Sequence, residues 1–331
     1  IDTGVDYDHP DLAGNIWHNS GEIPNNGVDD DKNGYIDDYT GWDFVSVTSG
    51  GDPNEDMGPP DNDPMDLHGH GTHCAGIASA VTNNSTGVAG TGWNCRIMTL
   101  RAGYKDEKGN GTLADSDCAA AMRYAAENGA NVLNMSWGSA GGSFILELAI
   151  DDVTKAGCVM VAAAGNENSR VKSYPAAYDE VIAVAASTSD ENDSRASYSN
   201  YGSWVDIAAP GSVIYSTVPD PKVPPYDDIY SYISGTSMST PFVAGVAGLM
   251  LSLEPALTPD VVAQRLVDSG DDIEWYADGQ LVEPSKRLNA YRALLLGQIA
   301  PDAPANLIAT AISNRQIELN WDNVGNEHGY E

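Results

Sequence analysis

The chain has 331 residues, of which 42% are hydrophobic, so it is long enough for one large domain or two smaller ones. Asp and Glu total 48 against 16 Lys and Arg, and the formal charge of −32 argues strongly against binding to nucleic acid or to an anionic membrane. No run approaches the ~18 apolar residues that a membrane span needs. This acidic balance fits a solvated surface, bound cations or a saline habitat.

The chain does not begin with Met, and it opens inside the motif Ile1-Asp2-Thr3-Gly4. We therefore expect a strand and a propeptide upstream of residue 1. An Asp between an apolar residue and Thr-Gly is typical of the carboxyl end of a strand, where α/β folds place functional groups. The same tripeptide marks aspartic proteases, which need two such carboxylates in a shared site. We disfavour that alternative.

An acidic loop near the N-terminus carries a calcium-binding pattern. Asp29, Asp31, Asn33 and Asp37 place oxygens at the spacing of the first part of an EF-type loop, with Gly34 at the sharp turn. No Glu occupies the last position of such a loop, so Asp37 or Asp38 must close the site differently. We predict a calcium ion here rather than a merely polar loop.

His68, His70 and His73 fall within six residues, in a Gly-rich segment that is typical of a helix start. Three His so close together also fit a metal site. For His68 and His73 we favour orientation and packing around the helix start. The glycines beside His70 let a substrate approach its ring, so we predict that His70 acts as a general base and then as a general acid.

Short apolar runs alternate with helical patterns over residues 95 to 250. The runs are nearly continuous, as expected for strands buried on both faces. They cover 97–100, 132–135, 159–164, 181–186 and 205–208. The helical patterns cover 113–128, 144–155 and 237–253, followed by helices from Thr258 and over 289–296. Strand–helix–strand repetition predicts an α/β fold with a parallel sheet and right-handed crossovers.

Ser237 follows Gly235, which permits a tight strand-to-helix turn, and precedes Pro241, which is tolerated in a first helical turn. We therefore expect Ser237 near a helix N-terminus, where its hydroxyl can be exposed and the helix dipole favours negative charge. A Ser at such a point is usually only an N-cap, so this motif alone does not establish a nucleophile.

The composition changes after Gly297, where Pro301 and Pro304 indicate a linker. We divide the chain into a domain over 1–297, a linker over 298–304 and a C-terminal fragment over 305–331. In that fragment, 306–312 and 317–321 alternate apolar and polar residues, as paired antiparallel strands do. The fragment resembles the opening of a fibronectin type III module and stops where the third strand would begin.

Asp2, His70 and Ser237, in that order and each in a Gly-rich motif, resemble the catalytic residues of the subtilase family of serine proteases. The resemblance covers residues 1 to about 296 and is strongest to the thermitase and proteinase K branches. It implies a three-layer α/β fold around a central, mostly parallel sheet, with a truncated all-β fragment behind it. It also implies a secreted, extracellular endopeptidase that acts on protein or peptide substrates in extended conformation.

The same resemblance implies roles for further residues. Asn166 would supply its side-chain amide to an oxyanion hole, together with the backbone N–H of Ser237. The residues that resemble the walls and edge of the substrate-binding site are Gly109, Asn110, Gly111, Ser136, Trp137, Gly138, Ala163, Ala164, Gly165 and Glu167. Gly109–111 would pair with the substrate backbone by strand addition. Apolar walls favour a large uncharged residue before the cleaved bond, and Glu167 at the rim would also admit a basic one.

A second calcium site follows from the resemblance alone. Its ligands would be the side chains of Asp11 and Asn84 and the backbone carbonyls of Thr82, Thr86 and Val88. Calcium is therefore the expected cofactor.

The four cysteines, Cys74, Cys95, Cys118 and Cys158, show no zinc-type spacing, and each has a context typical of a buried free thiol. By resemblance, Cys74 lies beneath the imidazole of His70. The sequence leaves undecided whether two of the other three cysteines form a disulfide.

Two other classes of function also stay open. One is a metallohydrolase that uses His68, His70 and His73. The other is an acidic calcium-binding or adhesion ectodomain on an inactive protease fold, which the fibronectin-like tail would support. A fluorophosphonate separates these classes, because only a serine hydrolase reacts with it at Ser237.

Overall fold

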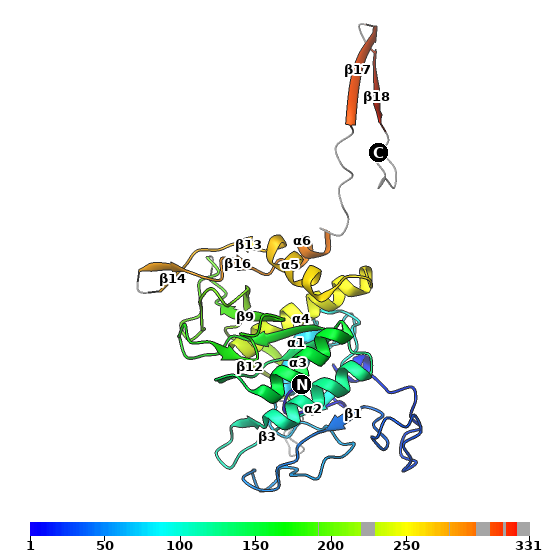
Figure 1. Cartoon of the computed structure of the whole chain (residues 1–331), viewed down its shortest axis with the longest axis vertical. Helices are drawn as coiled ribbons and strands as arrows, with labels where there is room; N and C mark the ends of the chain where they lie inside the picture. The colour runs from blue at the N-terminus through cyan, green and yellow to red at the C-terminus, as the bar shows by residue number, and fades with distance from the viewer. Residues whose placement is uncertain (191, 220–228, 278, 296–304, 314–315, 323–331) are drawn as a thin grey trace.

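The computed structural model describes residues 1–190, 192–219, 229–277, 279–295, 305–313 and 316–322. Its central sheet has six strands in the order β13–β16–β10–β9–β7–β5 (Figure 1). The parallel strands are β5 (Val132–Met135), β7 (Val159–Ala163), β9 (Val181–Ser187), β10 (Ile207–Pro210) and β16 (Lys286–Arg287). At the edge, β13 (Asp271–Asp272) runs antiparallel to β16. The predicted α/β class is confirmed, because four of the apolar runs form adjacent parallel strands of this sheet.

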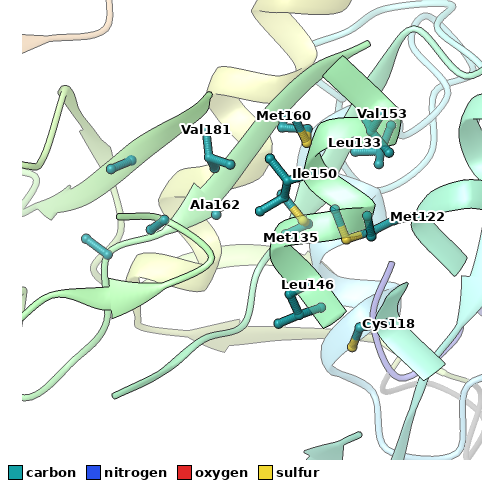
Figure 2. Close-up of a cluster of buried hydrophobic side chains, with 14 of the residues drawn as sticks. Cys118, Met122, Leu133, Met135, Leu146, Ile150, Val153, Met160, Ala162 and Val181 are labelled. Atoms are coloured by element: carbon teal, nitrogen blue, oxygen red, sulfur yellow. The ribbon is translucent and has the colours of Figure 1, made fainter. Parts of the chain in front are cut away.

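The first face of the sheet is covered by α2 (Asp115–Glu127) and α3 (Phe144–Ala156). Figure 2 shows Met122 and Ile150 from these helices against Met160 and Ala162 of β7. Alternate residues of a strand point to opposite faces, so Val159 and Val161 join the core on the other side. That alternation explains why β7 is apolar throughout.

The second face is covered by α4 (Thr236–Leu253), α5 (Pro259–Ser269) and α6 (Ala290–Leu295). Among the described residues, α4 is the one helix that is long and apolar enough to cross a membrane, which the sequence inspection did not anticipate. However, 61% of its 18 residues are buried, and it packs on β5, β7, β9 and β10. It is the core helix of this domain.

The apolar run at 97–100 does not join the large sheet. It overlaps β2 (Thr99–Arg101), which pairs in parallel with β1 (Gly41–Asp43). Asp2 lies between the two sheets, since its N–H donates to the Leu100 carbonyl (3.2 Å) and its carbonyl accepts from Ala102 N–H (2.9 Å). The Ile1 ammonium donates to the Asn134 carbonyl at the end of β5 (3.1 Å). An apolar cavity of about 610 Å³ continues between β2 and β5.

Helix α1 (His70–Ser79) packs against α4 and against strand β11 (Ile214–Thr217). The remaining short elements lie at the periphery of the sheet. They are η1 (Ala13–Asn15), β3 (Gly103–Lys105), β4 (Gly111–Leu113), β6 (Ser139–Ala140), β8 (Ser173–Tyr174), β11 (Ile214–Thr217), β12 (Tyr230–Ile233), β14 (Trp275–Ala277) and β15 (Gln280–Val282).

The two strands predicted near the C-terminus are present as β17 (Ala305–Ser313) and β18 (Gln316–Asp322), which pair antiparallel. The predicted linker over 298–304 and the tail after 322 lie outside the described residues. All four cysteines are free thiols, so none of the disulfides left open by the sequence is formed.

Candidate active site

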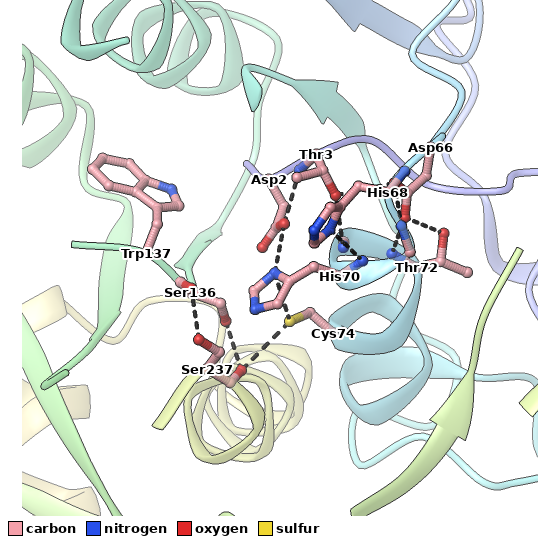
Figure 3. Close-up of polar contacts among 12 residues, drawn as sticks. Asp2, Thr3, Asp66, His68, His70, Thr72, Cys74, Ser136, Trp137 and Ser237 are labelled. Atoms are coloured by element: carbon pink, nitrogen blue, oxygen red, sulfur yellow. Dashed lines mark hydrogen bonds and ion pairs between the residues drawn. The ribbon is translucent and has the colours of Figure 1, made fainter. Parts of the chain in front are cut away.

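Asp2 and His70 meet at the carboxyl end of β2. His70 is the first residue of α1, and its Nδ1 lies 2.7 Å from Oδ1 of Asp2. The side chain of Asp2 is 9% exposed and that of His70 is 25% exposed, so the carboxylate is enclosed while the imidazole remains reachable. In Figure 3 His70 lies between Asp2 and Ser237.

The pair shifts the pKa of both groups. Burial alone would raise the pKa of Asp2, but the charge and hydrogen bond of His70 outweigh it and lower the pKa of that carboxyl. Burial alone would lower the pKa of His70, but the Asp2 carboxylate outweighs it and holds the pKa of the imidazole well above its ordinary value. Asp2 therefore stabilises the imidazolium that a general base becomes when it accepts a proton.

Asp66 connects the segment after Asp2 to the start of α1. Its carboxylate accepts hydrogen bonds from the N–H groups of His68 (2.9 Å), Gly69 (2.8 Å) and Thr72 (2.9 Å), and from the hydroxyls of Thr72 (2.6 Å) and Thr3 (3.0 Å). The residue is 2% exposed. The N-cap of α1, Gly69, has no side chain, so Asp66 instead binds the N–H of Thr72 in the first turn, together with those of Gly69 and His68 just before the helix. The sequence analysis did not predict this role.

Ser237 is the second residue of α4, directly after the turn at Gly235. Its Oγ donates to the Ser136 carbonyl (2.9 Å), and Oγ of Ser136 donates to the Ser237 carbonyl (2.8 Å). Cys74 lies against the same group, because its thiol is 3.4 Å from the Ser237 carbonyl and 3.9 Å from Nδ1 of His70. The buried free thiol thus lies next to the imidazole, as the resemblance implied.

Asn166 follows β7 and is preceded by Gly165, whose φ is +100°. A Cβ atom at Gly165 would lie 2.5 Å from the amide nitrogen of Asn200. Oδ1 of Asn166 accepts from the N–H (2.9 Å) and the hydroxyl (3.1 Å) of Thr236. These two bonds fix the orientation of the amide, since its oxygen faces α4. The amide nitrogen is then the donor left for a ligand beside Ser237.

Asp2, His70, Asn166 and Ser237 line a cleft of about 760 Å³. The predicted substrate-binding residues that line it are Gly111, Ser136, Trp137, Gly138, Ala163, Gly165 and Glu167. Gly109 and Asn110 lie instead in the exposed turn between β3 and β4, and Ala164 is fully buried. The lining residues that sequence reasoning missed include Thr112 and Leu113, which continue β4 from Gly111; Leu113 was predicted as the start of a helix. The cleft also includes Ser139, Ala140, Ser169, Val171, Lys172 and Ser173.

The three histidines of the α1 segment do not converge. His73 is fully buried, its Nε2 lies 3.1 Å from the carbonyls of Ile214 and Ser231, and burial lowers its pKa to about 4. Nδ1 of His68 accepts from the N–H of His70 (3.3 Å). In the part of the chain that the structure describes, no metal-type cluster contains two of these histidines. The geometry thus gives no support to a metallohydrolase.

A model of the subtilase family matches residues 1–291. The chain belongs to the subtilase family. Its relatives include thermitase from Thermoactinomyces vulgaris, which is 39% identical over 89% of this chain and 86% of its own length. The halolysin-like extracellular serine protease Nep from Natrialba magadii is 39% identical over 85% of this chain, which spans 44% of that relative. The thermophilic serine proteinase of Bacillus sp. (strain AK1) is 44% identical over 76% of this chain and 51% of its own length.

Solved structures agree with the family. A protease from Pseudoalteromonas arctica PAMC 21717 superposes with a TM-score of 0.71 at 30% identity, covering 89% of this chain and 88% of that one. A cold adapted subtilisin-like serine proteinase superposes with a TM-score of 0.64 at 31% identity, covering 87% of this chain and 86% of that one. The subtilisin-like fold is therefore confirmed, and the protein is a serine-type endopeptidase.

The acidic loop of this subtilase is arranged differently from the predicted calcium loop. Asp29 accepts from the N–H groups of Asn33 (3.1 Å) and Gly34 (2.9 Å), as the pattern suggests. The carboxylate of Asp37, however, accepts from the N–H groups of Asn26 (3.0 Å) and Gly27 (2.7 Å). Asp37 also has a left-handed φ of +56°, which the spacing pattern does not anticipate. Asp31 is brought together with Glu22 and Asp38 instead.

The second predicted calcium site does come together. Asp11 is fully buried, and its carboxylate accepts from the amide of Asn84 (2.6 Å), the N–H of Val88 (2.8 Å) and the hydroxyl of Tyr230 (3.3 Å). Among the described residues no Lys or Arg forms an ion pair with Asp11. A buried carboxylate that forms no ion pair with a cationic side chain of the described residues fits a calcium ion.

Proposed function

We propose that this subtilase is a secreted endopeptidase with Asp2, His70 and Ser237 as its catalytic triad. The observation that carries the proposal is the 2.7 Å contact between Asp2 and His70 in a cleft that Ser237 also lines. Oγ of Ser237 attacks the carbonyl carbon of the scissile peptide bond, and Nε2 of His70 accepts its proton. His70 then returns this proton to the leaving amine, which leaves an acyl-enzyme. Water, activated by the same imidazole, hydrolyses the ester and regenerates Ser237.

The negative charge that develops on the carbonyl oxygen is stabilised by two donors. One is the side-chain nitrogen of Asn166, whose orientation the two bonds to Thr236 support. The other is the backbone N–H of Ser237, in the first turn of α4, where N–H groups lack helical partners and the helix dipole is positive. The bonds from Thr236 to Asn166 and the position of Ser237 in the first turn of α4 support a hole that is preorganised for the oxyanion.

The substrate is a protein or peptide segment in extended conformation. The β4 strand lines the cleft on one side and Ser136–Gly138 on the other, which supports recognition by backbone pairing. The side chain before the cleaved bond lies between Ser136–Gly138 and Ala163–Gly165. These walls favour a large uncharged side chain, while Glu167 at the rim also admits a basic one.

Calcium stabilises the fold by binding at Asp11 and Asn84, with the carbonyls of Thr82, Thr86 and Val88 as further ligands. The buried carboxylate of Asp11 supports this assignment. Secretion is supported by the extracellular relative from Natrialba magadii. The antiparallel pair β17–β18 is consistent with the first two strands of a fibronectin type III module, which would follow the peptidase domain over 1–297.

The experiment that tests the triad is the Ser237→Ala variant. Its turnover of a peptide substrate falls by about 10⁶, the loss known for the nucleophile of subtilisin, because the proton and nucleophile steps act as one unit. Circular dichroism shows that the variant stays folded. Turnover that matches the parent protein would refute the triad.

A further inference from the structure

Three carboxylates meet in the acidic loop, outside the catalytic cleft. Ligand-type oxygens of Glu22, Asp31 and Asp38 all lie within 4.8 Å of one another. Asp38 is fully buried and Glu22 is 6% exposed. None of the three forms an ion pair with a Lys or Arg of the described residues. Carboxylates this close repel one another when they are ionised, and two of the three are buried, so a cation bound among them would stabilise the cluster.

Glu22 provides the second, independent observation. Its Oε1 accepts from the N–H groups of Asp30 (2.9 Å) and Asp31 (3.1 Å), which holds the carboxylate in place. Its Oε2 is buried and has no hydrogen-bond partner in the part of the chain that the structure describes. A buried carboxylate oxygen without a partner is costly unless a ligand satisfies it.

The groups around the cluster are neutral donors that orient the other two carboxylates. The Asn19 amide donates to Oδ2 of Asp31 and Oδ1 of Asp38, both at 2.9 Å. The Asn33 amide donates to Oδ2 of Asp38 (2.9 Å), as does the hydroxyl of Tyr124 from helix α2. These donors hold the carboxylate oxygens in place but do not neutralise their negative charge. Oxygen-only, anionic ligands select a hard divalent cation, and ligands from an irregular loop suit the variable geometry of calcium better than the strict octahedron of magnesium.

We propose that Glu22, Asp31 and Asp38 bind a calcium ion, at a site separate from that of Asp11. The ion fastens the acidic loop to the body of the peptidase, because Asp38 is bonded to Tyr124 of α2. This site replaces the set of Asp29, Asp31, Asn33 and Asp37 that the spacing predicted. It deepens the proposed dependence on calcium but does not rest on the catalytic assignment.

Cleavage after Lys32 by trypsin reports whether this loop opens. Lys32 is exposed in the loop and is the first Lys or Arg of the chain, with Arg96 next. The test uses the full chain with Ser237→Ala, which removes self-cleavage, and added trypsin. Calcium slows cleavage at Lys32 at least tenfold, because trypsin needs the loop to open. Glu22→Gln and Asp38→Asn abolish this protection. Since Asp31 is exposed, Asp31→Asn is the variant least disturbing to folding, and it also loses the protection.

Matched controls locate the effect. Asp30→Asn removes the same charge from the same loop but outside the cluster, and it keeps the protection of Lys32. Asp11→Asn, at the other calcium site, also keeps it. Calcium protection that survives in all three cluster variants would overturn the proposal, as would an absence of calcium protection in the Ser237→Ala parent. Neither result bears on the triad, which the turnover measurement tests separately.

Discussion

The Asp2 carboxylate has two effects on His70: it orients Nδ1 at 2.7 Å and it raises the pKa of the imidazole. General-base catalysis needs neutral His70, so activity is lost as the pH falls through this raised pKa. The same shift affects stability in the opposite sense. Because the pKa of His70 is higher in the folded state, its contribution to stability is complete below the unfolded pKa and is lost as the pH rises through the folded pKa.

The Asp2→Asn substitution removes the negative charge of the side chain and keeps its size and shape. We expect kcat to fall by about 10⁴, the loss known for the equivalent change in another Asp-His-Ser protease. We also expect the acid limb of kcat/KM to move to lower pH, since the pKa of His70 drops without the carboxylate. The measurement is a pH profile of kcat/KM for the parent and the variant. A uniform loss with an unmoved acid limb would contradict the electrostatic role of Asp2.

Asp66 shows what a single side chain contributes to an element. It binds three N–H groups at the start of α1, the helix that carries His70, and the hydroxyl of Thr3 next to Asp2. Asp66→Ala leaves these buried donors unpaired, so we expect the free energy of unfolding to fall by about 1–3 kcal/mol and kcat to fall with it. Asp66→Asn, which keeps one acceptor oxygen, recovers part of both losses.

The control for Asp66 is Asp8→Ala, which removes an exposed carboxylate from the segment after Asp2. Denaturant unfolding curves and peptide turnover are measured for all three variants. If Asp66→Ala is as stable and as active as Asp8→Ala, Asp66 does not position the start of α1.

The main helices and the parallel strands could be predicted from the sequence because their patterns are local. The buried run 159–164 became β7, and the helical pattern at 144–155 became α3, since apolar periodicity depends only on neighbouring residues. The three motifs of the proposed triad were also recognisable, because each carries its own glycines. Contacts across the chain were not predictable in this way.

The failures concern residues whose role depends on distant partners or on one backbone angle. In the sequence, Asp66 cannot be told from the acidic residues near it. It is distinguished only by its hydrogen bonds with Thr3 and with the start of α1 in the folded chain. Asp37 has a left-handed φ and its carboxylate contacts Asn26 and Gly27, while the carboxylate of Asp38 lies near that of Glu22. A spacing pattern cannot detect such a change of direction.

For the molecule as a whole, the excess of negative charge makes bound cations important. With a net charge of −32, self-repulsion opposes the compact state, and the calcium ions that we propose at buried carboxylates would offset part of it. In the Ser237→Ala variant, chelation should lower the Tm, and calcium but not zinc should restore it. Calcium at 100 times its Kd would add about 2.7 kcal/mol per site. A Tm that responds to neither chelator nor calcium would exclude calcium as a stabilising cofactor.

The Ser237 nucleophile is tested most directly by a fluorophosphonate followed by intact mass and peptide mapping. The Ser237 Oγ displaces fluoride from phosphorus, because His70 takes its proton and the Asn166 amide binds the phosphoryl oxygen. We expect one adduct per chain on Ser237, complete loss of peptidase activity, and no adduct on the Ser237→Ala variant or after heat unfolding. Activity that persists after complete labelling, or an adduct that forms equally on the Ser237→Ala variant, would contradict the assignment of Ser237 as the nucleophile.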